Sequence, residues 1–429
     1  GLPGYPDTEF ARGGRGMISA YTNARLIDPA SGLDTKGTLI VNNGKIADFG
    51  PDVTVPDDAT VTDCKGRVLC PGFIDMRAHS VDADAALAGG ITTVILQPDQ
   101  TTLIDSDPVV ERIRRRAEDT HTVNVYPMGA ATRGMEGMEL AEIGQMKASG
   151  AVAFTDCRKP VSSSQVMRRL MEYASYFGAV IVQFPQDVGL ANGGIAHEGE
   201  IATRLGFAGI PAMAEVIQIE RDARLSEMTG TPIHFALISS REGVEAVRAA
   251  KERGVKVTCS TAPHYLHLND NAMEGYRTFA KVSPPLRSEE DRLALIAGIA
   301  DGTIDTVVSD HDPKSEDVKR LPFGQAAAGI VGFETLLALA LGPVHAGKVD
   351  LITMLKALTA TPAELLGVPG GKLEAGAPAD LVIFDPDKPW RIDREAFRAS
   401  AKNTPFDTLP VQGQVWQTIV GGKALYSGE

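Results

Sequence analysis

Two styles of hydrophobic patterning divide this chain. From residue 17 to about residue 63, short stretches alternate apolar and polar residues, and turn signals separate them. Asn42-Asn43-Gly44 is typical of a β-hairpin turn. The same style returns in residues 380–384 and 417–420, near the other end. Because both ends share a strand pattern with one apolar face, we predict that they build one small β-sandwich together.

Between these ends, short apolar runs alternate with amphipathic segments of helical period. The predicted strands are 92–96, 123–126, 151–154, 179–182, 233–238, 255–258 and 306–308, and the predicted helices include 164–177, 241–252 and 289–299. Regular alternation of this kind predicts an α/β fold with a parallel sheet, and its length favours a closed (β/α)₈ TIM barrel. We therefore expect a leader or tag over 1–16, a β-sandwich from 17–66 and 366–429, and a barrel over 67–365.

Composition narrows the class of protein. The 429 residues carry a net charge of −13, which argues against a nucleic-acid or anionic-membrane binder. No apolar run is long enough to span a bilayer, and residues 1–16 lack the apolar core of a signal peptide. The four cysteines are scattered, which favours reduced, buried thiols and a cytoplasmic protein.

One segment carries the most informative chemistry. The apolar run Val68–Met76 leads into Arg77-Ala78-His79. A His-x-His pair at this point would place two imidazoles on one side of a strand, where both could bind one zinc ion. Arg77 cannot act as a ligand, because its guanidinium stays protonated and has no lone pair to donate.

Several further segments carry a resemblance to a known family. They are Pro71–Asp75, Ala88–Thr93, His197–Glu200, Gly209–Ala212, Lys281–Arg287, Ser309–Pro313 and Lys402–Phe406. With them the chain resembles the dihydroorotase branch of the amidohydrolase superfamily over nearly everything after Met17. The resemblance implies a metal-dependent hydrolase of cyclic amides. That family holds two zinc ions with a His-x-His pair, a bridging carboxylate, two further histidines and a last-strand aspartate.

When the family's ligands are carried over position by position, three of them remain as vestigial ligand positions: His79, Asp156 and Asp310. Asp310 is also the vestigial general base that the resemblance implies. The chain loses ligands at Arg77, Phe184 and Leu237, which offer no donor atom for zinc. The substrate-binding positions depart as well. Ser80-Val81 follow the first pair where the family has Leu-Arg, and about fifteen residues are missing after them. From these losses we expect no bound metal or other cofactor, no catalytic residue and no substrate-binding residue.

These losses lead to a main hypothesis and an alternative. The main hypothesis is a catalytically inactive dihydroorotase-like protein of pyrimidine biosynthesis. It would be a homodimer and a structural partner of aspartate carbamoyltransferase, as the resemblance to inactive homologues implies. The alternative is an active dihydroorotase with a reduced, mononuclear zinc site. Replacement ligands are also conceivable, and the candidates are His197, His264, His267 and His311.

Two further expectations concern buried side chains. Asp156 and Asp310 need a counter-charge once zinc is absent, because an unpaired buried carboxylate is costly. We predict that the Arg77 guanidinium supplies it by contacting one of them. His234 lies an odd number of residues from Leu237, so on a strand the two point to opposite faces. We expect His234 to be a buried histidine whose hydrogen bonds are satisfied.

Overall fold

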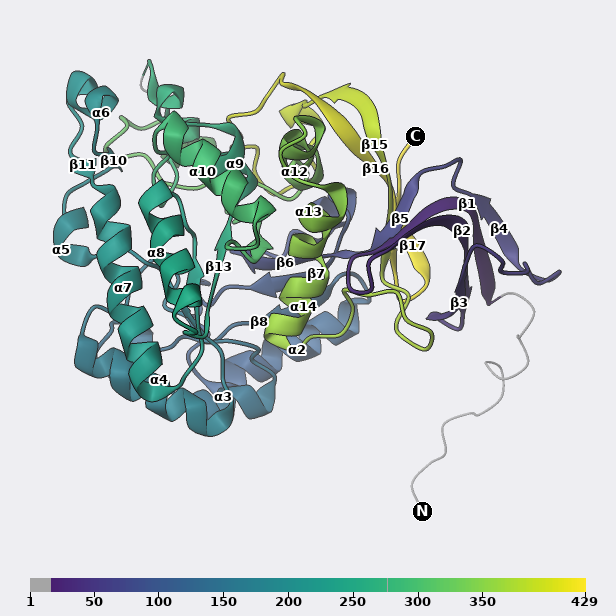
Figure 1. Cartoon of the computed structure of the whole chain (residues 1–429), viewed down its shortest axis with the longest axis horizontal. Helices are drawn as coiled ribbons and strands as arrows, with labels where there is room; N and C mark the ends of the chain where they lie inside the picture. Colours follow the sequence, from purple (N-terminus) through teal and green to yellow (C-terminus); the bar gives the residue numbers. More distant parts are fainter. Residues whose placement is uncertain (1–16, 276) are drawn as a thin grey trace.

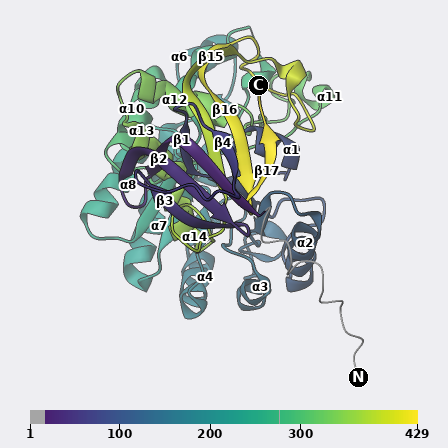
Figure 2. The same ribbon diagram turned by 90° about the vertical axis from the view of Figure 1, so that its right-hand side faces the viewer.

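Both ends of the chain meet in one mixed sheet of eight strands. The computed structural model describes residues 17–275 and 277–429; the predicted leader over 1–16 lies outside them. The strand order is β17-β16-β15-β5-β1-β2-β3, with β4 beside β1. The strands are β1 Ile18–Asp28, β2 Leu33–Asn42, β3 Lys45–Gly50, β4 Thr60–Asp63, β5 Val68–Pro71, β15 Leu381–Arg391, β16 Pro410–Val420 and β17 Lys423–Ser427. Figure 2 shows strands from the two ends side by side.

The sheet joins the two ends because their buried positions complement one another. β5 pairs with β1 in parallel and with β15 in the antiparallel sense, so it connects the N-terminal and C-terminal strands. Leu26, Leu69, Leu381 and Ile419 are fully buried in one hydrophobic cluster on this sheet. Alternate residues of a strand share a face, so the alternating pattern of each end provides one apolar side for this cluster.

The central region contains two parallel sheets covered by helices (Figure 1). One has the order β6-β7-β8 and the other β14-β13-β12-β9. Their strands are β6 Phe73–Ala78, β7 Ile91–Leu96, β8 Asn124–Pro127, β9 Ile181–Gln183, β12 Ile233–Ala236, β13 Val257–Thr261 and β14 Thr306–Val307. A separate two-stranded piece pairs β10 Ala196–His197 with β11 Gly209–Ile210.

The helices follow the amphipathic segments of the sequence. They are α1 Ala83–Ala88, α2 Asp107–Thr120, α3 Ile143–Ser149, α4 Ser164–Phe177, α5 Val188–Ala191, α6 Glu200–Leu205, α7 Ala212–Thr229, α8 Arg241–Glu252, α9 Pro263–His267, α10 Glu289–Ala300, α11 Glu316–Lys319, α12 Leu336–His345, α13 Leu351–Leu358 and α14 Ala360–Leu366. Short 3₁₀ turns occupy Arg133–Met135, Asp270–Met273, Thr278–Ala280 and Arg394–Ala396. The predicted helices 164–177 and 241–252 match α4 and α8 to the residue.

Helix α4 shows why these segments are helical. Met167, Leu170, Met171 and Ala174 are buried at a spacing of three and four residues, which places them on one face. Ser163 begins the helix, and its side chain accepts a hydrogen bond from the backbone N–H of Val166. The buried face packs into the core between the helices and the sheets.

The prediction of an α/β fold is confirmed, but a closed eight-stranded barrel is not detected in the described part of the chain. The strand expected over 151–154 is absent. Only Phe154 pairs, forming isolated bridges to Gly129 on one side and Ile181 on the other. A single bridge between Ala78 and His311 joins the other edges of the two sheets. Backbone hydrogen bonds continue on both sides of Phe154, since the N–H of Val152 donates to Pro127 and the carbonyl of Thr155 accepts from Ala131. The regular bridge pattern is nevertheless limited to Phe154.

Two predictions from composition can be compared with the structure. The four cysteines are buried and unpaired, as their scattered spacing predicted. Among the helices of the described residues, none combines the length and the apolar character needed to cross a membrane.

Candidate functional site at the strand ends

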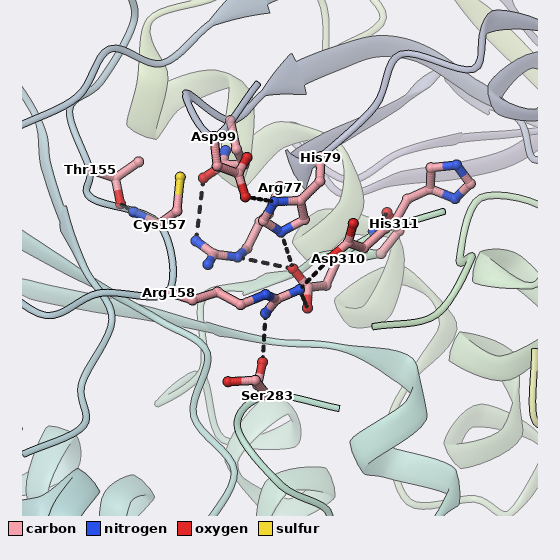
Figure 3. A network of polar contacts seen from close by, with 12 residues as sticks. Arg77, His79, Asp99, Thr155, Cys157, Arg158, Ser283, Asp310 and His311 are labelled. Carbon is pink, nitrogen blue, oxygen red and sulfur yellow. Dashed lines mark hydrogen bonds and ion pairs between the residues drawn. The ribbon is translucent and has the colours of Figure 1, made fainter. Parts of the chain in front are cut away.

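The carboxyl ends of β6 and β14 lie side by side, and this places the predicted ligand positions together. The backbone N–H of His79 donates to the carbonyl of His311 at 2.8 Å. Asp75 adds a second contact between these two strand ends, because its Oδ1 accepts a hydrogen bond from the backbone N–H of Ser309 at 2.9 Å. Asp310 has a φ of 51°, a left-handed backbone conformation that is uncommon outside glycine. In Figure 3 its carboxylate lies among Arg77, His79 and Arg158.

Asp310 accepts hydrogen bonds from three cationic or protonatable side chains. Its Oδ1 lies 3.1 Å from Arg77 Nε and 2.8 Å from His79 Nε2. Its Oδ2 accepts from Arg158 Nη2 at 3.0 Å. The side chains of Arg77, His79 and Asp310 are each only 3% exposed. The prediction that Arg77 supplies a counter-charge to a strand-end carboxylate is therefore confirmed, with Asp310 as the partner.

Further side chains extend this network, which we call the strand-end cluster: Arg77, His79, Asp99, Arg158, Asp310 and Asp312. His79 Nδ1 lies 2.6 Å from Asp99 Oδ2, so the imidazole lies between two carboxylates. Arg158 reaches Asp312 at 3.3 Å as well as Asp310. With His79 protonated, three cations face three anions inside this group. Such pairing is what permits several charges to remain buried at once.

The network changes the acid–base behaviour of its members. Burial opposes ionisation of Asp310, but the nearby charge of Arg158 and the hydrogen bond from His79 hold its pKa well below the ordinary range. Burial and the charge of Arg158 also oppose protonation of His79. The hydrogen bonds to Asp310 and Asp99 outweigh them and raise the pKa of His79 above 6.5. The two carboxylates beside the imidazole therefore favour its protonated form.

Asp156 is not part of the cluster. Its Oδ1 accepts the backbone N–H groups of Ala131 and Thr132, each at 3.0 Å, and its Oδ2 accepts the Thr132 hydroxyl at 2.5 Å. Burial raises the pKa of this carboxyl, although these hydrogen bonds oppose the shift. Across the described residues, no hydrogen bond or ion pair joins Asp156 to Arg77, His79 or Asp310. The structure thus gives Asp156 a role in fixing the segment 131–132.

Phe184 and Leu237 are buried side chains, 1% and 0% exposed, and neither offers a donor atom. Of the candidate replacement histidines, His197 and His311 contact other side chains, and His264 is buried with no hydrogen-bond partner on Nε2. His197 Nδ1 lies 3.0 Å from Arg287 Nη1, and His311 Nε2 lies 2.7 Å from Asp82 Oδ2. His234 is buried, but the prediction that it is fully satisfied is wrong: Nδ1 pairs with Thr258, whereas Nε2 has no partner.

The retained residues do not form the two-zinc centre that the resemblance implies. In the described parts of the chain, no three His, Cys, Asp or Glu side chains are grouped so that they could hold a metal ion. Arg77 occupies the position of a ligand, and its Nη2 is buried without a partner. A fixed guanidinium charge beside Asp310 repels a divalent cation, so the donor set disagrees with the metal content usual in this family.

Sequence reasoning missed Asp99 and Arg158 as members of the site. Asp99 comes three residues after the end of β7, and Arg158 two residues after Asp156, so both follow strand-like segments toward the same edge. Cys157 has a φ of 59°, and this turn precedes the residue that reaches Asp310 and the Ser283 carbonyl. A search for charged residues just beyond each strand would have found both.

With this geometry defined, comparisons with known proteins assign the class. Solved structures of a hydantoinase and of a dihydropyrimidinase share the fold. The L-hydantoinase (dihydropyrimidinase) from Arthrobacter aurescens aligns with a TM-score of 0.85 at 26% identity, covering 96% of each chain. The dihydropyrimidinase from Brevibacillus agri NCHU1002 aligns at 0.84 and 19% identity, which shows likeness of fold alone. The amidohydrolase family model matches residues 342–426. The chain therefore has the amidohydrolase architecture.

The particular family follows from the sequence relatives. The dihydro-orotase-like family model matches residues 66–243. The dihydroorotase of Syntrophus aciditrophicus (strain SB) is 41% identical over 415 residues, covering 94% of this chain and 97% of the relative. That of Anaplasma phagocytophilum (strain HZ) is 41% identical over 428 residues, covering 96% and 95%. This chain belongs to the dihydroorotase family.

These relatives correct the main hypothesis drawn from the sequence. They match nearly the whole chain at 39–41% identity, and each is named dihydroorotase. The prediction of a catalytically inactive structural partner is contradicted by this finding, which favours the alternative of an active dihydroorotase. The expectation that no cofactor is used also conflicts with the metal dependence of the family, with which the zinc alternative is compatible.

The buried contact between Arg77 and Asp310 yields a first prediction. Arg77→Ala should lower the free energy of unfolding by about 3–5 kcal/mol, because Asp310 loses a buried partner. Chemical denaturation measures this loss. Arg115→Ala is the matched control: Arg115 pairs with Glu111 on the surface, with 73% and 55% of the two side chains exposed, and should cost less than about 1 kcal/mol. Equal losses in the two variants would contradict the counter-charge role.

The raised pKa of His79 yields a second prediction. A group whose pKa is raised by folding stabilises the protein fully below its unfolded value, near 6.5, and this contribution is lost as pH rises through the folded value. The free energy of unfolding of the native chain relative to His79→Gln should therefore fall as pH increases above about 6.5. Denaturation series across pH measure the difference.

Proposed function

We propose that this chain hydrolyses a cyclic amide of the dihydroorotate type and closes the same ring in the reverse direction. The observation that carries the proposal is the near-full-length identity of 39–41% to proteins named dihydroorotase. The strand-end cluster supports it, because it brings one imidazole and two guanidinium groups together around Asp310. Hydrolysis of a cyclic amide needs a positioned proton donor or acceptor and positive charge near the developing oxyanion.

Particular residues suit a negatively charged ring. Arg158 is 20% exposed at its side chain, and it lines a hollow of about 410 Å³ together with Lys159, Gln186 and Asn192. These side chains provide hydrogen-bond donors for a carboxylate and for ring carbonyls. His79, held between Asp99 and Asp310, is the group proposed to exchange a proton with the ring. No step is assigned to a metal ion, since the donor set does not fit one.

We also propose that the two parallel sheets belong to one barrel with eight strand positions. The single bridges at Phe154 and between Ala78 and His311 support a ring in which Phe154 takes the position of the eighth strand. The solved amidohydrolase-type relatives of similar fold support the same arrangement.

The activity proposal is tested by dihydroorotate hydrolysis with the purified chain, before and after treatment with a chelator. We expect turnover that survives chelation, and a loss of on the order of a hundredfold in His79→Gln, the usual contribution of a general acid or base. Arg115→Gln should match the native chain. Activity that appears only on addition of zinc would replace this proposal with the reduced zinc site. Absence of turnover with and without zinc would contradict both.

The partnership suggested by the resemblance, with aspartate carbamoyltransferase and as a homodimer, is a separate proposal. It is tested by expressing the chain with and without the transcarbamoylase of the same source and measuring the masses of the purified products. We expect a joint complex and, for the chain alone, a dimer, because a stable interface needs roughly 1,000 Å² or more of buried surface and persists through purification. Two proteins that elute separately at micromolar concentration would contradict it.

A further inference from the structure

A groove on the outer side of the parallel sheets has the features of a second ligand site. It has a volume of about 520 Å³ and lies between helix α2 and the short connection from β6 to α1. We call it the α2 groove and define it by Val81, Val109, Ile113, Ala117, Arg112 and Arg116. Its size is within the range of small-molecule sites in proteins. In Figure 2, α1 and α2 lie on the same side of the molecule.

The floor and one wall of the α2 groove are apolar. Val109, Ile113 and Ala117 follow one another at intervals of four residues, so they share one face of α2. They are only partly buried, and they pack against the hydrophobic core together with Val81. The apolar lining is completed by Leu96, the last residue of β7, and by Val125 in β8. A ligand that covered this strip would remove apolar surface from water.

The rim of the groove carries two cations without partners. Arg112 and Arg116 are exposed and lie one turn apart on α2. In the part of the chain that the structure describes, neither side chain makes an ion pair or a hydrogen bond. Their neighbours on the same helix differ: Arg114 donates to the Val125 carbonyl, and Arg115 pairs with Glu111. In a chain with a net charge of −13, two adjacent unpaired arginines beside an apolar strip are a distinct local feature.

We propose that the α2 groove binds an amphipathic anion, a molecule with a flat or aliphatic apolar body and one carboxylate, sulfonate or phosphate group. The apolar body would lie on Val109, Ile113 and Ala117, and the anionic group would pair with Arg112 and Arg116. Guanidinium groups bind such oxyanions through two parallel hydrogen bonds. The α2 groove shares no lining residue with the hollow beside Arg158, so this site is separate from the proposed ring site.

The groove also contacts residues that hold the strand-end cluster in place. Gln100, in its wall, donates to the carbonyl of His79 at 3.0 Å. Asp82, at the other side, accepts a hydrogen bond from His311, the residue that follows Asp310. The groove therefore borders the two segments that position His79 and Asp310.

The test uses 8-anilinonaphthalene-1-sulfonate, a fluorescent aromatic anion, as the probe on the full chain. We expect saturable binding that weakens roughly tenfold in the double variant Arg112→Gln/Arg116→Gln, as two exposed charge pairs allow. Arg115→Gln removes the same charge from the same helix outside the groove and should leave binding unchanged. The uncharged analogue N-phenyl-1-naphthylamine should bind the native chain more weakly, by a similar factor.

A second variant tests the apolar half of the site without altering its charge. Ala117→Phe fills the strip between the α2 side chains and should weaken probe binding, while circular dichroism and thermal unfolding check that the fold is retained. The inference is overturned if the arginine double variant binds the sulfonate probe as tightly as the native chain does. It is equally overturned if Arg115→Gln weakens binding to the same extent, because the effect would then be one of general charge.

Discussion

The carboxylate of Asp310 organises this site because it is buried and it cannot remain charged alone. Burying an unpaired carboxylate in a protein interior lowers the free energy of unfolding by roughly several kcal/mol, unless the group is paired and hydrogen-bonded. Arg77 and His79 at the end of β6 and Arg158 in the segment after Phe154 provide those bonds. The pairing therefore fixes how β6, β14 and the segment after Phe154 meet. In this chain, the Arg77 guanidinium contacts Asp310 from a position where the family resemblance implies a zinc ligand.

The family of this chain and the side chains at its site point to different chemistry. The family membership is clear, because the relatives align over nearly the entire length at 41% identity. The donor atoms for a two-zinc centre are nevertheless replaced at Arg77, Phe184 and Leu237. The hydrolysis that we propose therefore relies on proton transfer and fixed positive charge. Both are present in the cluster, and electrostatic preorganisation of this kind is a large contributor in many enzymes.

The sequence predicted some parts of the site and missed others for physical reasons. The contact of Arg77 with Asp310 could be expected, because two ligands of one metal site must lie close together in space. Asp156 was expected beside them, but the backbone N–H groups of Ala131 and Thr132 bind its carboxylate. Backbone donors in a loop leave no mark in a sequence pattern. The same holds for Arg158, whose reach depends on the left-handed turn at Cys157.

The sequence alone determined the α/β class, the helices α4 and α8, the association of the two β-rich ends and the resemblance to the family. Hydrophobic period and turn residues encode the fold features locally, and short segments such as Pro71–Asp75 carry the resemblance. Only the tertiary structure decided that Phe154 supplies a single bridge, that His79 lies between Asp99 and Asp310, and that Arg112 and Arg116 lack partners. These contacts join residues that are far apart in the sequence, and only the packing of the whole chain decides which of them meet in space.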